Sequence, residues 1–427
     1  MADEIPSIQI LDKKDYFQQA LVPLPSALPY PPLPPSSLRL RTRVLGLTVN
    51  NFTYATLGTL LHWWDVHPLP ASTPAPYNDA SKYGRVSAWG YAEVLDSTLP
   101  SVPKGSYVWG YVPLGTLPQD LEARPHPELP DQVFVTSPHR ARVMPIYNRY
   151  FVYPAAGGGD IAAAIAAKTP EVARDAVLRV MHATAFLLSR FVFNPSPSSA
   201  VAPGPGPDDA WGAKDADLSD ATVVVFAPGS KVATLFAALL ARRAPGKGAR
   251  PRRIVGASSA SSRAFVEGTG VYDGVVLATA PDPVVAAMSG VDVGKRVVVF
   301  DFGGRAGVGA RWAEALSARY PEGFLYVGVG AGVVEPADAP ARLAAMARTP
   351  PFATARVNAD DMRRRAMASV GEAAYWAEEG VSWEEFRRDG VKGLEIAWGE
   401  GMGDVVKGWD RLARGEVLPS EGLVYRL

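Results

Sequence analysis

The segment TVVVFAPGSKVATLFAALLARR, residues 222–243, restricts the fold of this chain more than any other. A run of valines, typical of a buried strand, leads into a tight turn of small residues and then at once into an apolar helix. Such a junction gathers unbonded backbone N–H groups and the positive end of a helix dipole around one point, which suits a phosphate. We therefore predict a dinucleotide-phosphate site at this turn; the alternative is an ordinary strand–helix turn. The predicted phosphate-binding residues are Pro228, Gly229, Ser230, Lys231 and Val232.

The sequence after this turn repeats the same unit. Short valine-rich runs alternate with alanine-rich helical stretches, which is typical of a parallel sheet covered by helices on both faces. The predicted strands are Ala221–Ala227, Arg253–Ala257, Gly274–Leu277, Arg296–Phe300 and Phe324–Val329. We therefore expect a doubly wound α/β domain in this part of the chain.

The end of the second predicted strand indicates which dinucleotide would bind. It carries no acidic residue, whereas an NAD site places Asp or Glu on the ribose 2′-hydroxyl. It carries serines and an arginine instead, which suit a 2′-phosphate through charge-assisted hydrogen bonds. These residues are Ser258, Ser259, Ser261, Ser262 and Arg263. NADPH is thus the predicted cofactor, and a polar loop without a ligand is the alternative.

The segments that flank this α/β unit have a different character. From Leu38, alternating apolar and polar residues with glycine-rich turns predict a β-rich unit, and residues 171–193 have the apolar spacing of a helix. Residues 194–220 are rich in Pro, Gly, Ser and Asp, so we expect a disordered surface loop there. Residues 415–427 indicate a final strand.

Composition excludes several classes of protein. The 43 basic residues equal the 43 acidic ones, which argues against nucleic acid or an acidic membrane as partner. The absence of cysteine excludes disulfides, thiolate metal sites and a cysteine nucleophile. No apolar run approaches the ~18 residues of a membrane span, and the N-terminus does not have the pattern of a signal peptide. We therefore expect a cytoplasmic protein.

Several segments together resemble the medium-chain dehydrogenase/reductase superfamily, especially its zinc-free quinone-oxidoreductase and enoyl-reductase branch. They are RTRVLGLTVNNFTYATLG (41–58), GRVSAWGYAEVL (84–95), GSYVWGY (105–111), VVVFAPGSKVA (223–233), YDGVVLAT (272–279), KRVVVFDFGGRAG (295–307) and GEVLPSEGLVYRL (415–427). The two central glycines of the family's phosphate turn are replaced by Ser230 and Lys231, and the last one by Ala233. The catalytic zinc ligands are absent. Within the superfamily the chain looks closest to a divergent, largely uncharacterised bacterial and fungal group.

The resemblance implies two domains. We expect a GroES-like catalytic domain from residues 1–175 and 352–427, with a Rossmann domain of residues 176–351 inserted between them. It also implies an NADPH-dependent reductase of an activated C=C or C=O, such as an enone, a quinone or a polyketide-like carbonyl. The alternatives are a non-redox lyase or isomerase, and a non-enzymatic binding protein. The oligomeric state stays open, with a homodimer as one alternative.

The segment LTVNNFTYATLG matches the part of the family whose polar side chains face the nicotinamide. The resemblance therefore implies that Tyr54 protonates or hydrogen-bonds the substrate oxygen and that Asn50 and Asn51 orient it. A core tyrosine and ordinary Asn-Asn turn chemistry are the alternatives.

Aromatic residues are dense in the β-rich unit and predict a flat, apolar pocket for a conjugated or aromatic small molecule. They are Trp63, Trp64, Trp89, Trp109 and Tyr111. An ordinary aromatic core is the alternative. His62 and His67, with Asp65 between them, have no convincing third ligand, so no metal site is predicted. His182 could face the cofactor cleft or be an interior histidine.

Overall fold

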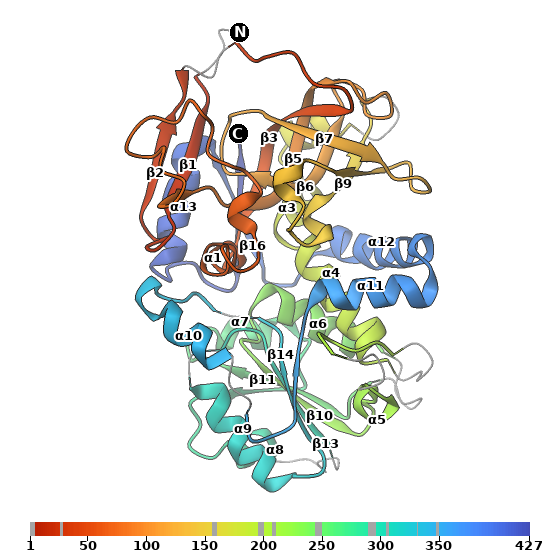
Figure 1. Ribbon diagram of the computed structural model, residues 1–427. Coiled ribbons are helices and arrows are strands. Elements are labelled where there is room, and N and C mark those ends of the chain that lie inside the picture. The colour runs from red at the N-terminus through yellow and green to blue at the C-terminus, as the bar shows by residue number, and fades with distance from the viewer. Residues whose placement is uncertain are drawn as a thin grey trace.

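The structure of the protein is a computed structural model that describes residues 5–25, 29–155, 160–194, 200–206, 211–243, 250–288, 296–304, 307–330, 332–346 and 350–427. It is an α/β protein with a barrel-like sheet and a parallel sheet, one above the other in Figure 1. The helices are α1 (Asn50–Thr56), α2 (Ile161–Ala166), α3 (Pro170–Val177), α4 (Arg179–Leu187), α5 (Ala213–Ala216), α6 (Lys231–Ala241), α7 (Arg263–Thr269), α8 (Pro283–Met288), α9 (Val308–Arg319), α10 (Ala339–Met346), α11 (Ala359–Val370), α12 (Glu372–Asp389) and α13 (Gly401–Ala413).

The parallel sheet has six strands in the order β12-β11-β10-β13-β14-β15. They are β10 (Ala221–Phe226), β11 (Arg253–Ser258), β12 (Gly274–Leu277), β13 (Arg296–Asp301), β14 (Phe324–Gly328) and β15 (Thr354–Arg356). Numbered along the chain within this sheet, the order is 3-2-1-4-5-6, so the winding reverses between β10 and β13. The five strands predicted from valine-rich runs are confirmed, and β15 is an addition that the sequence did not predict.

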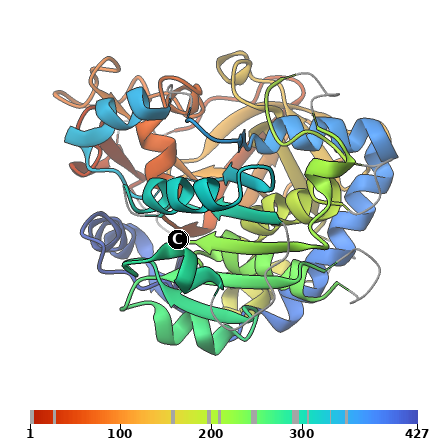
Figure 2. The ribbon, with the colours of Figure 1, turned by 90° about the horizontal axis from the view of Figure 1, so that it is seen from below.

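Both faces of this sheet are buried, because alternate residues of each strand point to opposite sides. Val223 and Val225 of β10 lie in one core cluster with α6, whereas Val224 and Phe226 lie in another with Trp312 of α9. Figure 2 shows helices on both faces of the sheet. The valine runs are therefore continuous rather than alternating.

The second large sheet has eight strands in the order β16-β17-β3-β5-β6-β9-β8-β7. They are β3 (Ser37–Leu47), β5 (Ser87–Ser97), β6 (Tyr107–Pro113), β7 (Gln119–Pro125), β8 (Gln132–Val135), β9 (Arg149–Tyr153), β16 (Glu395–Glu400) and β17 (Glu421–Arg426). The further pairing of β3 with β7 closes six of these strands into a barrel. A third, small sheet consists of β1 (Ser7–Asp12), β2 (Gln19–Pro23) and β4 (Tyr83–Gly84). The predicted β-rich unit and final strand are confirmed.

The helix predicted for residues 171–193 is found as α3 and α4, which continue into a π-helical turn at Leu188–Val192. Helix α3 lies so close to β3 that a Cβ on Gly46 would stand 2.4 Å from the Ala176 carbonyl oxygen. Only glycine permits this approach. Helices α11 and α12 form a hairpin beside α4 and α6 (Figure 1).

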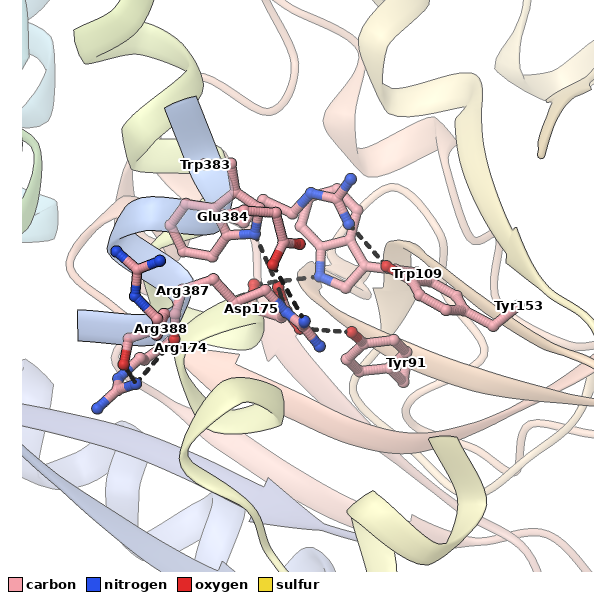
Figure 3. A network of polar contacts seen from close by, with 10 residues as sticks. Tyr91, Trp109, Tyr153, Arg174, Asp175, Trp383, Glu384, Arg387 and Arg388 are labelled. Carbon is pink, nitrogen blue, oxygen red and sulfur yellow. Dashed lines mark hydrogen bonds and ion pairs between the residues drawn. The ribbon is translucent and has the colours of Figure 1, made fainter. Parts of the chain in front are cut away.

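A buried polar network joins α12 to α3 and to the barrel (Figure 3). The Asp175 carboxylate, 1% exposed, accepts hydrogen bonds from the Tyr91 hydroxyl at 2.6 Å and from Trp383 Nε1 at 2.9 Å. It also accepts one from Arg387 Nε at 3.0 Å, and the Asp175 carbonyl accepts another from Trp109 Nε1 at 3.1 Å. The network therefore fixes α12 against the barrel strands.

The prediction of a disordered loop over residues 194–220 is wrong for the part that the structure describes. Val201, Ala202 and Leu218 are buried, and α5 lies within the segment. The Arg365 guanidinium donates hydrogen bonds to the carbonyl oxygens of three residues in 200–206, the shortest at 2.7 Å. Polar composition misled the prediction because this ordering comes from α11, far along the chain. Residues 195–199 and 207–210 lie outside the described residues.

In the part of the chain that the structure describes, no helix has the length and apolar character that crossing a membrane requires.

Candidate functional site

A cavity of about 510 Å³ lies between the parallel sheet and the barrel unit. Its wall on one side consists of the segments that follow the carboxyl ends of β10, β11, β12, β13 and β14. The other side includes residues 47–50 and Thr53, at the end of β3 and the start of α1, and residues 417–419 and Glu421, just before and at the start of β17. Ligands of doubly wound sheets bind at this edge, where the winding reverses. We call this cavity the cleft.

The turn from β10 to α6 forms part of the cleft wall. All five predicted phosphate-binding residues, Pro228 to Val232, line it. Ala227 has a φ of +50°, a left-handed conformation that glycine adopts most readily. The backbone therefore keeps a glycine-like turn although the sequence has alanine there.

The Ser230 side chain and the backbone at the start of α6 offer hydrogen-bond donors to an anion. The Ser230 hydroxyl is buried and has no hydrogen-bond partner among the described residues. The first backbone N–H groups of α6 have no partner within the helix, and the positive end of its dipole lies at the same place. The turn therefore has hydrogen-bond donors without a partner at the wall of the cleft.

Lys231 extends from this turn toward the barrel unit. Its Nζ donates a hydrogen bond to the Glu421 carbonyl oxygen at 2.7 Å. The Glu421 carboxylate is itself paired with Arg411 at 2.7 Å. Burial lowers the pKa of Lys231 to about 8, although the nearby Glu421 opposes this shift. The ammonium therefore has little compensation and would gain from an anion in the cleft.

The serines after β11 also line the cleft, but Arg263 does not. Ser258, Ser259, Ser261 and Ser262 are in its wall, and the Ser259 hydroxyl lies 3.0 Å from both the Ser261 and Ser262 hydroxyls. Arg263 is half-exposed and pairs with Glu267 at 2.7 Å, one turn along α7. The structure thus brings the predicted serines together at the cleft and turns the predicted arginine toward its own helix.

Asn50 is the predicted catalytic residue that reaches the cleft. It lies at the start of α1 and lines the cavity beside Thr53. Its Nδ2 donates a hydrogen bond to the Tyr54 hydroxyl at 2.5 Å. Asn51 is buried instead, where its Oδ1 accepts from the Thr48 N–H at 2.8 Å and its Nδ2 donates to the Ser87 carbonyl at 2.9 Å. Asn51 therefore holds the backbone of the turn.

Tyr54 lies behind Asn50 and does not line the cleft. The side chain is 2% exposed, and its hydroxyl also accepts a hydrogen bond from Trp89 Nε1 at 2.9 Å. Burial raises the pKa of the phenol well above its usual value. This geometry corrects the expectation of direct contact with a substrate: the hydroxyl holds Asn50 in place. The helical spacing of four residues puts Asn50 and Tyr54 on one face of α1, with Tyr54 inward.

The predicted aromatic pocket is a packed core. Trp63, Trp89, Trp109 and Tyr111 are buried in one cluster with Tyr54, and Trp64 is buried in another. Trp89 and Trp109 stack with ring centroids 5.0 Å apart. None of the five lines the cleft. Trp89, Trp109 and Tyr111 lie on β5 and β6 in the cluster that includes α3, whereas Trp63 and Trp64 lie in the 3₁₀ helix Trp63–Asp65. All five therefore have the usual role of large aromatic residues, which is to fill the core.

The histidines lie away from the cleft. His62 Nδ1 is 3.1 Å from Asp65, and His182, fully buried, contacts Glu379 and Ser382 of α12. Within the described ranges, no three His, Cys, Asp or Glu side chains are grouped as a metal ion requires.

The family follows from comparison of the sequence. Residues 45–418 match the family described as "Protein of unknown function (DUF2855)". The chain belongs to this family. No curated protein matches it.

Solved structures match the whole chain at low sequence identity. The chain is similar to the "CurF ER cyclopropanase from curacin A biosynthetic pathway", with a TM-score of 0.56, 11% identity and 99% of both chains covered. It is similar to a "putative NADPH:quinone reductase" from Bacillus thuringiensis, with a TM-score of 0.54, 12% identity and 100% of both chains covered. It is also similar to CurA of Vibrio vulnificus in complex with NADPH, with a TM-score of 0.52, 11% identity and 98% of both chains covered. The resemblance to medium-chain dehydrogenases/reductases is thereby confirmed for the fold.

Sequence reasoning missed part of the cleft wall. Met181 of α4, Leu412 of α13 and residues 417–421 line it. Residues 417–421 lie nearly 200 positions beyond the β10–α6 turn, and their sequence carries no ligand-binding signal. Only the folding of β17 onto β3 brings them there.

Proposed function

We propose that the protein is an NADPH-dependent reductase of an activated C=C or C=O, such as an enone, a quinone or a polyketide-like carbonyl. The observation that carries this proposal is the cleft, in which the β10–α6 turn faces Asn50 across one cavity. A protein named as an NADPH:quinone reductase shares the fold, and so does CurA, whose structure is in complex with NADPH. Because fold alone does not decide function, the proposal depends on the residues of the cleft.

We further propose that the parallel sheet is a Rossmann domain and that the barrel unit is a GroES-like catalytic domain. The strand order 3-2-1-4-5-6 supports the first assignment. The expected division placed 1–175 and 352–427 in the catalytic domain. Since β15 pairs with β14, we move the second boundary beyond Arg356.

The cleft residues fit a phosphorylated dinucleotide. The unpartnered Ser230 hydroxyl, the Lys231 ammonium and the start of α6 would hold the pyrophosphate. The hydroxyls of Ser259, Ser261 and Ser262 would hold the 2′-phosphate in place of an acidic residue. When bound, the reduced nicotinamide supplies a hydride.

On the barrel side, Asn50 and Thr53 supply the polar groups of the cleft. We assign to Asn50 the contact with the substrate oxygen, whose developing charge needs a fixed hydrogen-bonding partner. Tyr54 is a positioning residue, because its hydroxyl binds Asn50 and lies outside the cleft wall. Neighbouring apolar residues, among them Leu47, Val49 and Met181, exclude water.

Calorimetric titration with NADPH and NADH tests the cofactor. We expect NADPH to bind at least ~10-fold more tightly, a difference of ~1.4 kcal/mol. Ser230→Glu, which puts negative charge at the phosphate position, should abolish binding while circular dichroism stays unchanged. Unchanged affinity of this variant would reject the turn as the phosphate site. Absence of binding to wild type would favour the non-enzymatic alternative.

Loss of NADPH absorbance with a panel of quinones and α,β-unsaturated ketones tests the reaction. Turnover that disappears in Asn50→Ala while NADPH affinity is retained would support the assignment. Tight NADPH binding with no turnover across the panel would contradict the proposed substrate class and favour a non-redox lyase or isomerase.

A further inference from the structure

Away from the cleft, the barrel unit contains two buried arginines without an acidic partner. Arg85 lies between β4 and β5, and Arg140 ends the short 3₁₀ helix Pro138–Arg140. Each is only 1% exposed. Neither is paired with Asp or Glu in the part of the chain that the structure describes. Two full positive charges are therefore enclosed in the protein.

The hydrogen bonds of these arginines are to neutral oxygens, and the Arg140 guanidinium also lies 5.7 Å from the centroid of the Tyr150 ring. Arg85 Nη1 lies 3.4 Å from the Pro68 carbonyl and 3.3 Å from Gln119 Oε1, both long for a hydrogen bond. Its Nε and Nη2 are buried without a partner. Arg140 donates to the Tyr150 hydroxyl at 3.2 Å and to the Tyr147 carbonyl at 3.0 Å, and its Nε has no partner. Three buried guanidinium nitrogens therefore have no hydrogen-bond partner among the described residues.

His67 is linked to both arginines through their hydrogen-bond partners. It precedes Pro68, whose carbonyl lies 3.4 Å from Arg85 Nη1. It also bonds to the backbone of Tyr111, whose carbonyl accepts from the same Tyr150 hydroxyl that contacts Arg140. It is also 1% exposed, and its Nε2 has no hydrogen-bond partner. Burial, and then the charges of Arg140 and Arg85, hold the pKa of His67 well below its usual value. Burial alone lowers the pKa of Arg85 to about 10, with no opposing carboxylate. Two charged arginines and one neutral imidazole from three separate segments thus form one region, which we call the barrel cation cluster: His67, Arg85 and Arg140.

An isolated buried charge is strongly destabilising, and folded proteins almost always pair it. Water can accept the unused N–H bonds but cannot balance the charge. We propose that the barrel cation cluster encloses a small inorganic anion such as chloride, sulfate or hydrogen phosphate. A divalent oxyanion would balance both arginines and accept from Arg85 Nε and Nη2 together. This site is separate from the cleft and does not depend on the proposed reductase activity.

Thermal unfolding of the full chain tests this proposal. Ionic strength is held constant with sodium gluconate, whose bulk excludes it from an enclosed site, while chloride, sulfate or phosphate is added. We expect a saturable rise in the midpoint of about 2–5 °C for at least one of these anions at 100-fold excess over its Kd. No saturable rise with any of the three would overturn the proposal.

Variants locate the effect. Arg85→Met should lose the rise and, in gluconate alone, should be at least as stable as wild type, because a charge without a partner is removed. Lys231→Met, which removes the cation of the cleft, should keep the rise. Arg364→Met, a control for net charge at an exposed site, should also keep it. An equal rise in Arg85→Met would show that the anions act elsewhere and would reject the cluster.

If Arg85→Met does not fold, a crystal of the wild-type protein soaked in bromide decides the question. Anomalous density within hydrogen-bond distance of both Arg85 and Arg140 is the expected result. Density confined to the cleft or to the surface, or none at all, would overturn the proposal.

Discussion

At the level of single residues, burial determines which polar groups can take part in chemistry. Asn50 and Tyr54 are four positions apart and hydrogen-bonded, yet only Asn50 lines the cleft. The tyrosine hydroxyl accepts two hydrogen bonds in the core, and burial raises its pKa. Under the proposed function, Tyr54 would affect a substrate only through the orientation of Asn50.

Tyr54→Phe tests this positioning role. We expect kcat to fall by about tenfold, because Asn50 loses its anchor but stays in the cleft. NADPH affinity should stay within about twofold. Tyr77→Phe, remote from the cleft, is the matched control. A fall of ~10²–10⁴-fold, which is the usual effect of losing a general acid, would instead make Tyr54 the proton donor.

Lys231 predicts a pH dependence of cofactor affinity. Its pKa of about 8 means that the ammonium that attracts phosphate is present below pH 8 and is lost above it. NADPH affinity should therefore fall between about pH 7 and 9.5, whereas that of Lys231→Met should change little. Calorimetry across this range measures the difference. An equal pH dependence in both proteins would exclude Lys231 as its source.

The same lysine should make the folded protein more stable as pH rises, although it makes cofactor binding weaker. Its folded-state pKa is lower than that of the unfolded chain, so the unfolded chain binds more protons between about pH 8 and 10.5. Without cofactor, the free energy of unfolding should therefore increase as pH rises through this window, so that the folded protein becomes more stable. Urea titrations should show that Lys231→Met lacks this increase.

At the level of elements, one junction forms part of the cleft wall and another fixes helix α12 in place. The β10–α6 turn keeps Ala227 at a φ of +50°, and the Asp175 network fixes α12 on α3 and the barrel. The turn itself was predictable, because a valine run, small residues and an apolar helix follow one another locally. The Asp175 network was not, because its partners come from β5 and α12, far apart in sequence.

Two substitutions at Ala227 test the turn. Ala227→Gly should be neutral or stabilising by up to about 1 kcal/mol, because relief of the left-handed strain outweighs the entropy of glycine. Ala227→Val should be destabilising by about 1–2 kcal/mol, since a β-branched residue tolerates this conformation worst. Urea unfolding measures both. Destabilisation by glycine greater than that by valine would contradict the assigned backbone conformation.

Asp175→Asn tests the network. The substitution keeps the shape but removes the charge that faces Arg387, and we expect a loss of about 3 kcal/mol in the free energy of unfolding. Asp389→Asn, at an exposed pair with Arg388, should leave the free energy of unfolding nearly unchanged. Equal effects of the two substitutions would show that the buried Asp175 network adds nothing to the free energy of unfolding.

At the level of the whole molecule, the cleft is a property of two sheets together. Lys231 of α6 binds the carbonyl of Glu421 in β17, and a Cβ on Gly229 would stand 3.0 Å from Pro419. A ligand in the cleft therefore contacts both units and should stabilise both.

Scanning calorimetry with NADPH at 100-fold excess over its Kd tests this coupling. Binding should contribute about 2.7 kcal/mol and raise the unfolding transition of both units together. NADPH should not change the unfolding temperature of the Ser230→Glu variant. A rise confined to one of two separate transitions would contradict a cleft shared by the two units.

The sequence by itself determined the features that depend on near neighbours. Valine runs followed by helices specify buried parallel strands, and alternating residues from Leu38 specify the barrel strands. The small residues of the phosphate turn indicated where an anion could bind. These features follow from local periodicity and backbone geometry, which can be read without knowing any distant contact.

Only the tertiary structure decided which side chains face the cleft. Tyr54 and the tryptophans are buried in the core, Arg263 turns to Glu267, and residues 417–421 enter the cleft wall. Strand periodicity assigns a residue to one face of a sheet but does not say whether that face meets a helix, a cavity or solvent. That outcome depends on how the barrel unit and the parallel sheet pack, because contacts between residues hundreds of positions apart determine it.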